Sequence, residues 1–533
     1  MGKLENLIKN MTIREKAAQL VMQEIKGFNT INEPYISLIK DNNITGFIYL
    51  TTNNIRKPEE LAEFTYYLQQ KSKGSNLGIP LLISIDQEGG QLHSLINSIH
   101  HPGNMAIGES KKPIEYAKFA GYMTSKQLYD AGIALNFAPV VDILYDSHIP
   151  YPDNRSFGSD PVFVTQLASA FCKAHEKNHV ATCIKHFPGQ RILPFRQDTH
   201  FELDIIDYPL KRLENVEFYP FKELAKQNVA SIMAGHCIYK VIDEKYPASL
   251  SKKLLTDIVR NKWNYNGLLI TDDIGMGAIK RYFSFEDSIV LSINAGIDIV
   301  LSMGEYIDVT SIIEKAVINK KISEERLNNA CLNVLKFKEK WINKNFKPKK
   351  SKFYFNTPEF KEKVQQISDD SIILYKNSKN LIPIKNLNEK YILIIHPVFH
   401  RLFPADQSNF AIPDFNKIIP EYTKNFHVSA IGLEPTETEV DSIFDLIEWP
   451  DIIIILSMNA FYFKKQQQLI QRIIEEKQDK VITASLRSPS DVKYYEKTNT
   501  HFIMFGHTEY QIHSLMKAIT GKITPKTKIN LKL

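Results

Sequence analysis

The feature that most constrains the fold is an alternation that repeats along the first two thirds of the chain. Short apolar runs are each followed by a segment with helical periodicity, which is typical of βα units and a parallel sheet. Eight such runs over about 340 residues predict an α/β fold, a (β/α)8 TIM-like barrel. The runs lie at residues 20–26, 44–50, 79–87, 134–143, 179–187, 230–239, 267–273 and 296–303.

The last third of the chain predicts a second, smaller domain. A helix is expected at 323–342, and the lysine-rich segment 343–353 after it is typical of a linker. Further apolar runs then alternate with helical segments and predict an α/β three-layer sandwich, with a parallel sheet between two helical layers. These runs lie at 391–397, 428–433, 451–458, 480–486 and 501–507. The expected organisation is a barrel domain at 1–342, a linker region at 343–375 and a sandwich domain at 376–533.

Composition and charge exclude several classes of protein. Hydrophobic residues make up 43% and charged residues 24% of the chain, which disfavours disorder and coiled coil. The net charge of +6 is spread without a long basic block, so no nucleic-acid partner is expected. Residues 1–20 lack the apolar core of a signal peptide, and no run is long enough to span a bilayer. With four widely spaced cysteines, this predicts a cytoplasmic protein with reduced thiols and no membrane insertion.

Polar residues stand at the carboxyl ends of most barrel runs. This is the edge at which (β/α)8 barrels carry their active sites. A strand end that approaches water explains Asp142 on its own, whereas so many polar ends meeting at one mouth favour a functional site. The residues are Asp86, Asp142, Lys185, His186, His236, Asp272 and Asp273.

The stretch CIKHFPGQRILPFRQDTHF (183–201) adds a candidate proton-transfer pair. Asp198 stands two residues before His200, so its carboxylate can reach one imidazole nitrogen and fix the tautomer of the other. An imidazole with a free pKa of about 6.5 is suited to general acid and base catalysis. For a D-x-H motif alone, ordinary loop residues remain the simpler interpretation.

The barrel also carries short motifs in a fixed order. They are IDQEGG (85–90), NFAPVVDI (136–143), RSFGSDP (155–161), KHFPG (185–189), DTH (198–200), PASLS (247–251) and TDDIGM (271–276). Together they resemble glycoside hydrolase family 3, specifically its β-N-acetylglucosaminidase branch. KHFPG followed by D-[ST]-H marks that branch, because the related β-glucosidases lack this histidine. The resemblance covers the whole barrel, and the second domain only in its general pattern.

The resemblance implies a role for each matching residue. Asp272 is implied as the nucleophile and His200 as the general acid/base, with Asp198 orienting it. No metal and no cofactor is implied. The residues implied to hold the sugar hydroxyls before the cleaved bond are Asp86, Arg155, Lys185 and His186.

The chemistry of the residues agrees with these roles. Asp272 ends the seventh apolar run, where a carboxylate can face an anomeric carbon and form a covalent intermediate. Asp273 is its rival, but adjacent residues at a strand end point in different directions, so only one faces the pocket. Lys185 and His186 alone could be a salt-bridged lysine and a core histidine, and their place beside the candidate catalytic loop favours binding.

Two stretches depart from the family. IDQEGG is usually followed by Arg-Val-x-Arg, and this chain has Gln91 and Ser94 at the arginine positions. KHFPG is usually continued by His-Gly, and here Gln190 begins a longer loop that contains Arg191 and Arg196. We hypothesise that these two arginines recognise an anionic aglycone, while a solvated loop explains them equally well.

The sequence therefore predicts a retaining exo-β-N-acetylglucosaminidase that acts on small oligosaccharides, as a monomer or a homodimer. Muropeptides from peptidoglycan recycling and chito-oligosaccharides are the expected substrates. The alternatives are a β-glycoside phosphorylase, a family member of other specificity, and a catalytically impaired sugar-binding homologue. A metal hydrolase built on His186, His200 and His236 is disfavoured, because no compact His-x-His or His-Glu-x-x-His motif is present.

Overall fold

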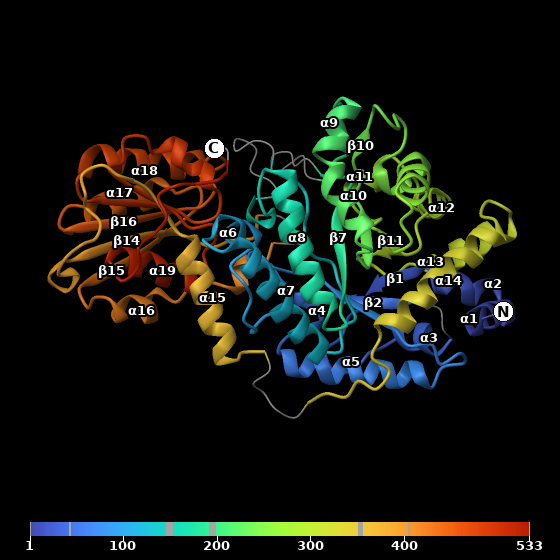
Figure 1. Cartoon of the computed structure of the whole chain (residues 1–533). Helices are drawn as coiled ribbons and strands as arrows, with labels where there is room; N and C mark the ends of the chain where they lie inside the picture. Colours follow the sequence, from blue (N-terminus) through green and yellow to red (C-terminus); the bar gives the residue numbers. More distant parts are fainter. Residues whose placement is uncertain are drawn as a thin grey trace.

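The computed structural model describes residues 2–41, 44–144, 153–190, 199–349, 355–402 and 406–531. They form two domains that lie side by side (Figure 1). The N-terminal domain is a barrel of parallel strands, and the C-terminal domain is a six-stranded sheet covered by helices. The predicted fold class, a TIM-like barrel followed by an α/β sandwich, is confirmed.

The barrel strands run in the ring order β1-β2-β3-β6-β7-β9-β11-β12. The ring closes where Ile270 of β11 bridges Ile299, whose N–H donates to the carbonyl oxygen of Leu269 at 3.1 Å. Each of the eight predicted strands is present. Their bounds are β1 Val21–Glu24, β2 Gly46–Tyr49, β3 Leu82–Ile85, β6 Leu135–Asn136, β7 Ala181–Phe187, β9 Ser231–Ala234, β11 Leu268–Thr271 and β12 Val300–Ser302.

Alternate residues of each strand enter two separate cores, because strand side chains alternate between faces. Met22 belongs to the cluster inside the barrel, whereas its neighbour Val21 packs outward with the helices. Phe337 and Trp341, from the last turns of α14 (Glu324–Trp341), join the inner cluster. They close the amino ends of the strands, so the opposite, carboxyl edge is left for the site.

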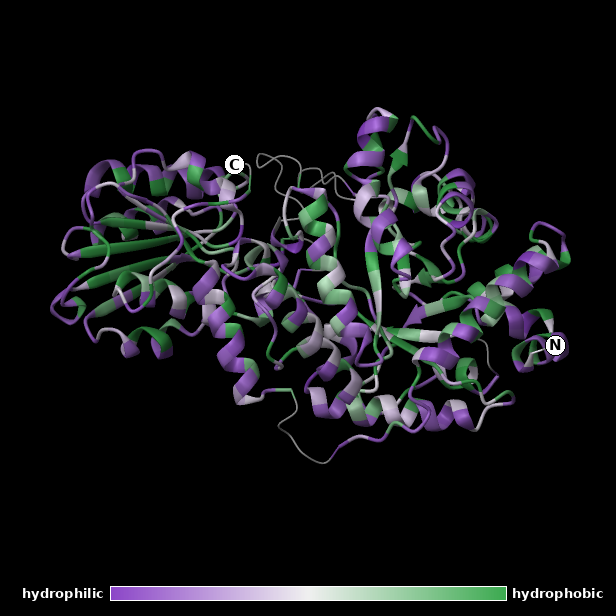
Figure 2. Cartoon of the chain, in the orientation of Figure 1, coloured by the Kyte–Doolittle hydropathy of each residue, from purple (hydrophilic) through white to green (hydrophobic). Residues whose placement is uncertain are grey.

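Helices and shorter segments surround the barrel. Figure 2 shows that the strands are mostly apolar and that the helices around them have polar outer faces. The shorter elements are the hairpin β4 (Gln87–Gly89) and β5 (Leu92–His93), the pair β8 (Ile205–Ile206) and β10 (Ile238–Tyr239), 3-10 turns at Asp153–Arg155 and Ala248–Leu250, and a π-helix at Lys253–Lys262. The helices are α1 Lys3–Asn10, α2 Ile13–Ala18, α3 Tyr35–Lys40, α4 Thr51–Asn54, α5 Pro58–Lys73, α6 Asn104–Glu109, α7 Pro113–Asp130, α8 Pro161–Glu176, α9 Leu210–Asn215, α10 Phe218–Lys226, α11 Gly277–Lys280, α12 Phe285–Ala295, α13 Val309–Ile318 and α14 Glu324–Trp341.

The C-terminal sheet has the order β13-β18-β17-β16-β14-β15. The five predicted strands are present, and one further strand corrects the prediction of a parallel sheet. Strand β13 (Ile373–Asn377) runs antiparallel to β18 at the edge. It was missed because most of its residues are only partly buried, so no apolar run marks it. The other strands are β14 Ile392–Pro397, β15 Phe426–Ile431, β16 Ile452–Ser457, β17 Val481–Ser485 and β18 Thr500–Ile503.

Helices cover both faces of this sheet. Ile454 of β16 packs in one cluster with Leu515 of α19, and its neighbour Ile455 packs in another with Ile470 of α18. The sandwich therefore has three layers, as predicted. Its helices are α15 Pro358–Ser371, α16 Phe415–Ile418, α17 Glu437–Leu446, α18 Lys464–Lys477 and α19 Glu509–Ile519, with 3-10 turns at Leu387–Glu389, Ser408–Phe410, Ile419–Glu421 and Pro489–Tyr494.

The two domains are joined by more than the chain between them. The segment 343–375, expected as a linker region, contains α15 and the start of β13. The end of the chain returns to the barrel, where the amides of Asn530 and Leu531 each donate to the Glu109 carboxylate at 2.9 Å. Within the described ranges, no helix has both the length and the apolar character to cross a bilayer.

Candidate active site

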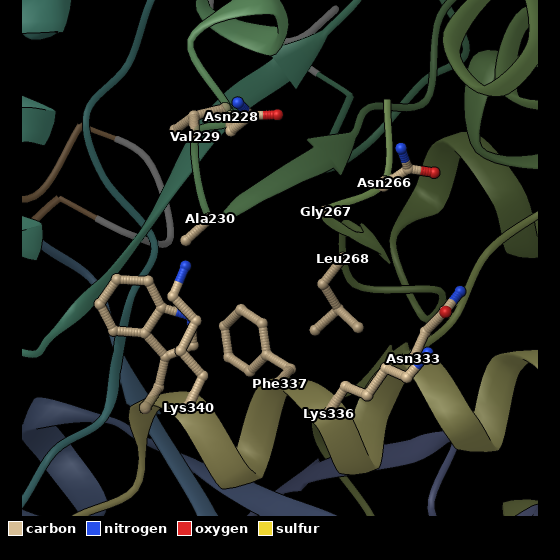
Figure 3. A pocket seen from close by; sticks show the side chains of 11 residues that line it. Asn228, Val229, Ala230, Asn266, Gly267, Leu268, Asn333, Lys336, Phe337 and Lys340 are labelled. Atoms are coloured by element: carbon tan, nitrogen blue, oxygen red, sulfur yellow. The ribbon is translucent and has the colours of Figure 1, made fainter. Parts of the chain in front are cut away.

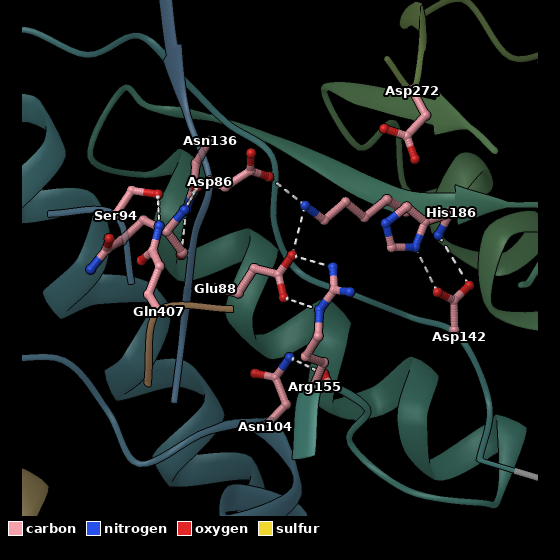
Figure 4. Close-up of polar contacts among 12 residues, drawn as sticks. Asp86, Glu88, Ser94, Asn104, Asn136, Asp142, Arg155, His186, Asp272 and Gln407 are labelled. Carbon is pink, nitrogen blue, oxygen red and sulfur yellow. Dashed lines mark hydrogen bonds and ion pairs between the residues drawn. The ribbon is translucent and has the colours of Figure 1, made fainter. Parts of the chain in front are cut away.

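A buried cluster of charges lies at the carboxyl ends of β3 and β7 (Figure 4). The Lys185 ammonium is 2.5 Å from Asp86 Oδ1 and 2.7 Å from Glu88 Oε1. Arg155 donates from Nε and Nη2 to the two oxygens of Glu88, each at 2.7 Å. Glu88 therefore joins two cations, and the lysine joins Glu88 to Asp86.

These contacts keep Glu88 and Lys185 ionised. Burial of Glu88 would raise its pKa, but the charges of Arg155 and Lys185 lower it to about 2. Burial would lower the pKa of Lys185, yet Asp86 and Glu88 raise it. The Asp86 side chain is 23% exposed, whereas those of Glu88 and Lys185 are almost fully buried. Asp86 is thus the member of the cluster that is most accessible from the barrel mouth.

A second polar group centres on Asp142. Its Oδ2 is 2.7 Å from His186 Nδ1, and its Oδ1 accepts from the backbone N–H groups of His186 at 3.0 Å and Gln190 at 2.9 Å. Asp142 is 1% exposed. The interpretation of this residue as a strand end near water is therefore wrong. The chain folds back over it, and the carboxylate orients His186.

Asp272 and Asp273 follow β11 and have different surroundings. The Asp272 carboxylate points toward His186 (Figure 4), and its Oδ1 accepts the Asp273 N–H at 2.8 Å. Asp273 Oδ1 instead accepts from the amides of Gly275 at 3.1 Å and Met303 at 2.9 Å. Asp273 therefore ties two loops of the barrel together, and Asp272 is the carboxylate directed at the site.

The two aspartates also differ in acidity. Burial would raise the pKa of Asp272, but the charges of His186, His236 and His200, with the Asp273 amide, lower it. Burial and the charge of Asp272 raise the pKa of Asp273 to about 6, although the Met303 and Gly275 amides oppose this shift. At neutral pH Asp272 is an anion held among three imidazoles, as a nucleophile requires.

His236 lies beneath this pair of aspartates. Its Nε2 donates to the carbonyl oxygen of Asp273 at 2.9 Å, and its Nδ1 lies 2.8 Å from Ser249 Oγ. Burial lowers the pKa of His236, and the charge of Asp272 opposes this shift. A carbonyl oxygen only accepts, which places the proton on Nε2. His236 thus holds the backbone next to Asp272 and has both ring nitrogens engaged.

The segment that carries His200 is described from Thr199 onward. Gln190 Nε2 donates to Thr199 Oγ1 at 2.6 Å, and the Gly277 amide donates to the carbonyl oxygen of His200 at 3.0 Å. Gly277 is five residues after Asp272 in the sequence, so α11 brings His200 to the side of the barrel on which Asp272 lies. Asp198, the predicted partner of His200, lies outside the described residues, as do Arg191 and Arg196.

The structure thus gathers most of the predicted residues at one barrel mouth. Sequence reasoning assigned no role in the proposed chemistry to three further residues of the site. Glu88 lies in the motif IDQEGG, after a strand and directly before two glycines. An acidic residue at such a strand end was the signal that could have identified it. Gln190 and His236 were noticed but given no role. The predicted residues that the structure describes near this mouth are Asp86, Arg155, Lys185, His186, His200 and Asp272.

The C-terminal domain reaches the hairpin that departs from the family. Gln407 Nε2 donates to Ser94 Oγ at 3.1 Å and to Thr51 Oγ1 at 2.7 Å. The Gln407 amide also donates to the carbonyl oxygen of Gln91 at 2.9 Å. Behind it, Arg487 and Asp406 form a fully buried ion pair at 2.8 Å. The two residues that replace the usual arginines therefore face the second domain.

A cavity of about 250 Å³ lies away from this site, at the amino ends of β9 and β11 against α14 (Figure 3). Its lining includes Asn228, Asn266 and Asn333, with Lys336 and Lys340. Among the described residues that line it there is no Asp, Glu or His. It therefore lacks a carboxylate or an imidazole that could act as a nucleophile or a general acid. In the described parts of the chain, no three His, Cys, Asp or Glu side chains are grouped to hold a metal ion.

Comparison with known proteins matches the chain to a family. The model of the glycosyl hydrolase family 3 N terminal domain matches residues 12–337. β-Hexosaminidase A of Pseudoalteromonas piscicida is 26% identical over 443 residues, which cover 78% of this chain and 71% of that protein. A β-hexosaminidase of Haemophilus influenzae is 30% identical over 328 residues, 60% of this chain and 90% of its own length. A family 3 β-N-acetylglucosaminidase structure from Paenibacillus sp. str. FPU-7 superposes with a TM-score of 0.88 at 27% identity, covering 97% of this chain and 98% of that one.

Proposed function

Because the chain belongs to glycosyl hydrolase family 3 and is a glycoside hydrolase of the β-N-acetylhexosaminidase type, we propose that it releases terminal β-linked N-acetylglucosamine with retention of configuration. The observation that carries the proposal is the Asp272 carboxylate, an anion directed toward His186 and lying within the field of His200. A nucleophile and a candidate acid/base on one barrel mouth are what a double displacement needs.

In the proposed first step, Asp272 attacks the anomeric carbon and His200 gives a proton to the leaving glycosidic oxygen. The bond to the aglycone breaks, and the sugar becomes an ester of Asp272. In the second step, neutral His200 accepts a proton from water as the water attacks the same carbon and frees Asp272. Asp198 is proposed to fix the tautomer of His200 in both steps.

The sugar is proposed to lie over the Asp86–Lys185 pair, with His186 beside it. Asp86 supplies an acceptor, and Lys185 and His186 supply donors for neighbouring hydroxyls. Arg155 is 5% exposed and paired with Glu88, so we propose that it takes part in sugar binding through Glu88. Such charge-assisted contacts are stronger than neutral ones, which suits a polar ligand taken from water.

A panel of chromogenic substrates tests this function. The protein should hydrolyse a β-N-acetylglucosaminide and leave the β-glucoside and β-xyloside nearly untouched, and chelators should not change the rate. A preference for the β-glucoside would assign the chain to a different specificity within the family. Inactivity on the whole panel would favour the sugar-binding homologue, and loss of activity with chelator would favour the metal hydrolase.

Phosphate in the same assay separates hydrolysis from phosphorolysis. A carboxylate acid/base would be anionic after the first step, and at about 4 Å it would oppose phosphate by about 4 kcal/mol at an effective dielectric of about 20. Neutral His200 removes that barrier, which is the reason to keep a β-glycoside phosphorylase as the second candidate. Formation of a sugar 1-phosphate as the main product would select it.

Muropeptide fragments of peptidoglycan are the proposed natural substrates, and chito-oligosaccharides are the alternative. Faster hydrolysis of chitobiose than of an N-acetylglucosaminyl-muramic acid disaccharide would favour the alternative. The cytoplasm is the proposed compartment, because Cys172, Cys183, Cys237 and Cys331 are all free and buried. A monomer or a homodimer is proposed, which light scattering in solution distinguishes.

A further inference from the structure

The segment that begins at Thr199 and carries His200 is held by hydrogen bonds on two sides. In the proposed chemistry, these contacts would fix the position of His200. On one side, Gln190 donates from its side chain to Thr199 Oγ1 at 2.6 Å. Gln190 is 5% exposed, and its own amide donates to Asp142 Oδ1 at 2.9 Å. A chain of hydrogen bonds therefore runs from His186 through Asp142 and Gln190 to the residue before His200.

On the other side, the segment rests on α11. The Gly277 amide donates to the carbonyl oxygen of His200 at 3.0 Å, and the Ala278 amide donates to that of Thr199 at 3.2 Å. These are the first N–H groups of the helix, which have no partner within it. The carbonyl oxygens beside His200 thus satisfy donors that would otherwise require water.

The approach is close enough to need glycine at 277. A Cβ on Gly277 would lie 2.5 Å from the carbonyl oxygen of Phe201 and 2.8 Å from that of His200. Both are backbone atoms, so a larger residue must displace the segment or the helix. A further contact lies on the exposed side of the segment, where Glu202 accepts hydrogen bonds from Arg281 at 2.8 Å and from the Tyr282 hydroxyl.

We propose that Gln190 and Gly277 are positioning residues that fix the place of His200 relative to Asp272. The proposal rests on the function proposed above, in which His200 is the acid/base. Gln190 replaces the histidine usual in the family, so the longer loop of this chain carries its own anchor. Gly277 begins α11, the helix that follows Asp272. The same element therefore fixes the positions of both proposed catalytic groups, Asp272 and His200.

The test uses leaving groups of different quality. A poor leaving group such as the sugar of chitobiose needs a proton from the acid, whereas a dinitrophenolate leaves without one. The variants are Gly277→Ala, Thr199→Val, which removes the hydroxyl acceptor, and Thr199→Ser, which keeps it. Gly74→Ala is the matched glycine control, because a Cβ there would be 3.6 Å from the nearest atom. His200→Ala is the reference for loss of the acid/base.

We expect Gly277→Ala and Thr199→Val to lower kcat/KM at least about tenfold on chitobiose and less than about threefold on the dinitrophenyl glycoside. Azide should raise the kcat of these two variants on the dinitrophenyl glycoside, because azide attacks the covalent intermediate without a general base. Thr199→Ser should lose less than Thr199→Val, and Gly74→Ala should match the unmodified protein. Equal losses on both substrates, with a lower melting temperature, would mean that the contacts are structural and would overturn the proposal.

The reference variant separates the two possible failures. If His200→Ala shows no dependence on the leaving group, the assignment of His200 as acid/base is wrong. If His200→Ala shows that dependence and the Gly277 and Thr199 variants do not, the acid/base assignment holds and the positioning proposal is wrong.

Discussion

The carboxylate of Asp142 accepts two hydrogen bonds from His186, one from the ring Nδ1 at 2.7 Å and one from the backbone N–H at 3.0 Å. Since a carboxylate only accepts, Nδ1 carries a proton in this contact and the ring has one orientation. Asp142 touches no position proposed for the sugar. Asp142 therefore affects the proposed sugar site through the orientation of His186.

Replacement of Asp142 by Asn should therefore weaken sugar binding. Asn keeps the size but offers one acceptor oxygen to three donors, and an unsatisfied buried donor costs about 1–3 kcal/mol. We expect kcat/KM on the N-acetylglucosaminide to fall at least about fivefold, mainly through a higher KM. Unchanged kinetics in a folded Asp142→Asn protein would show that His186 needs no such partner.

Glu88→Gln should destabilise the barrel. The change leaves Lys185 and Arg155 buried with one fewer negative charge, and breaking a buried pair costs about 3–5 kcal/mol. The midpoint of thermal unfolding should fall by roughly 5–10 °C. Glu223→Gln is the control, because its partner Lys226 lies 2.7 Å away on the surface, where such pairs contribute little. Equal midpoints for the two variants would contradict the role of Glu88.

Much of the architecture follows from the sequence because its determinants are local. Apolar runs and their spacing mark thirteen strands of the two main sheets, and strand ends mark Asp272 and Lys185. Strand β13 is not marked, because an edge strand with partly exposed residues leaves no apolar run.

The supports of the site are not predictable in this way, because each depends on a distant partner. Arg155 meets Glu88 across 67 positions, and Gln190 meets Asp142 across 48. Gln407 meets Ser94 from the other domain, 313 positions away. Only the closed barrel and the docked second domain decide which of these polar residues are buried and paired.

Asp273 should impose a pH dependence on stability. Its pKa rises from an ordinary 3.8 to about 6 in the folded protein. A carboxyl with a raised folded pKa contributes stability below about pH 4, and that contribution is lost as the pH rises through about 6. The loss is about 3 kcal/mol, from two pKa units at about 1.4 kcal/mol each.

The comparison with Asp273→Asn isolates this effect. The Asn side-chain oxygen still accepts from Gly275 and Met303, and it does not titrate. The difference in unfolding free energy between the two proteins, measured from pH 4 to pH 8, should change in favour of the variant as the pH rises. A difference that stays constant over that range would contradict the raised pKa.

Arg191 and Arg196 lie outside the described residues, and the hypothesis of anionic recognition by them is testable. Replacing both by Gln should lower kcat/KM on an acidic muramic-acid disaccharide and leave a neutral chromogenic glycoside nearly unchanged, because only the former carries a carboxylate. Equal effects on both substrates, or none on either, would leave these arginines without a charge-based role.

The central claim is that Asp272 forms a covalent bond with the sugar, and it is tested most directly by trapping that bond. A fluorinated N-acetylglucosaminyl fluoride whose intermediate hydrolyses slowly is incubated with the protein, and peptide mass spectrometry locates the added mass. We predict one sugar on the peptide that contains Asp272, with fragmentation placing it on Asp272 and not on Asp273. A label on Asp273, or substrate turnover with inversion and no label, would contradict the account.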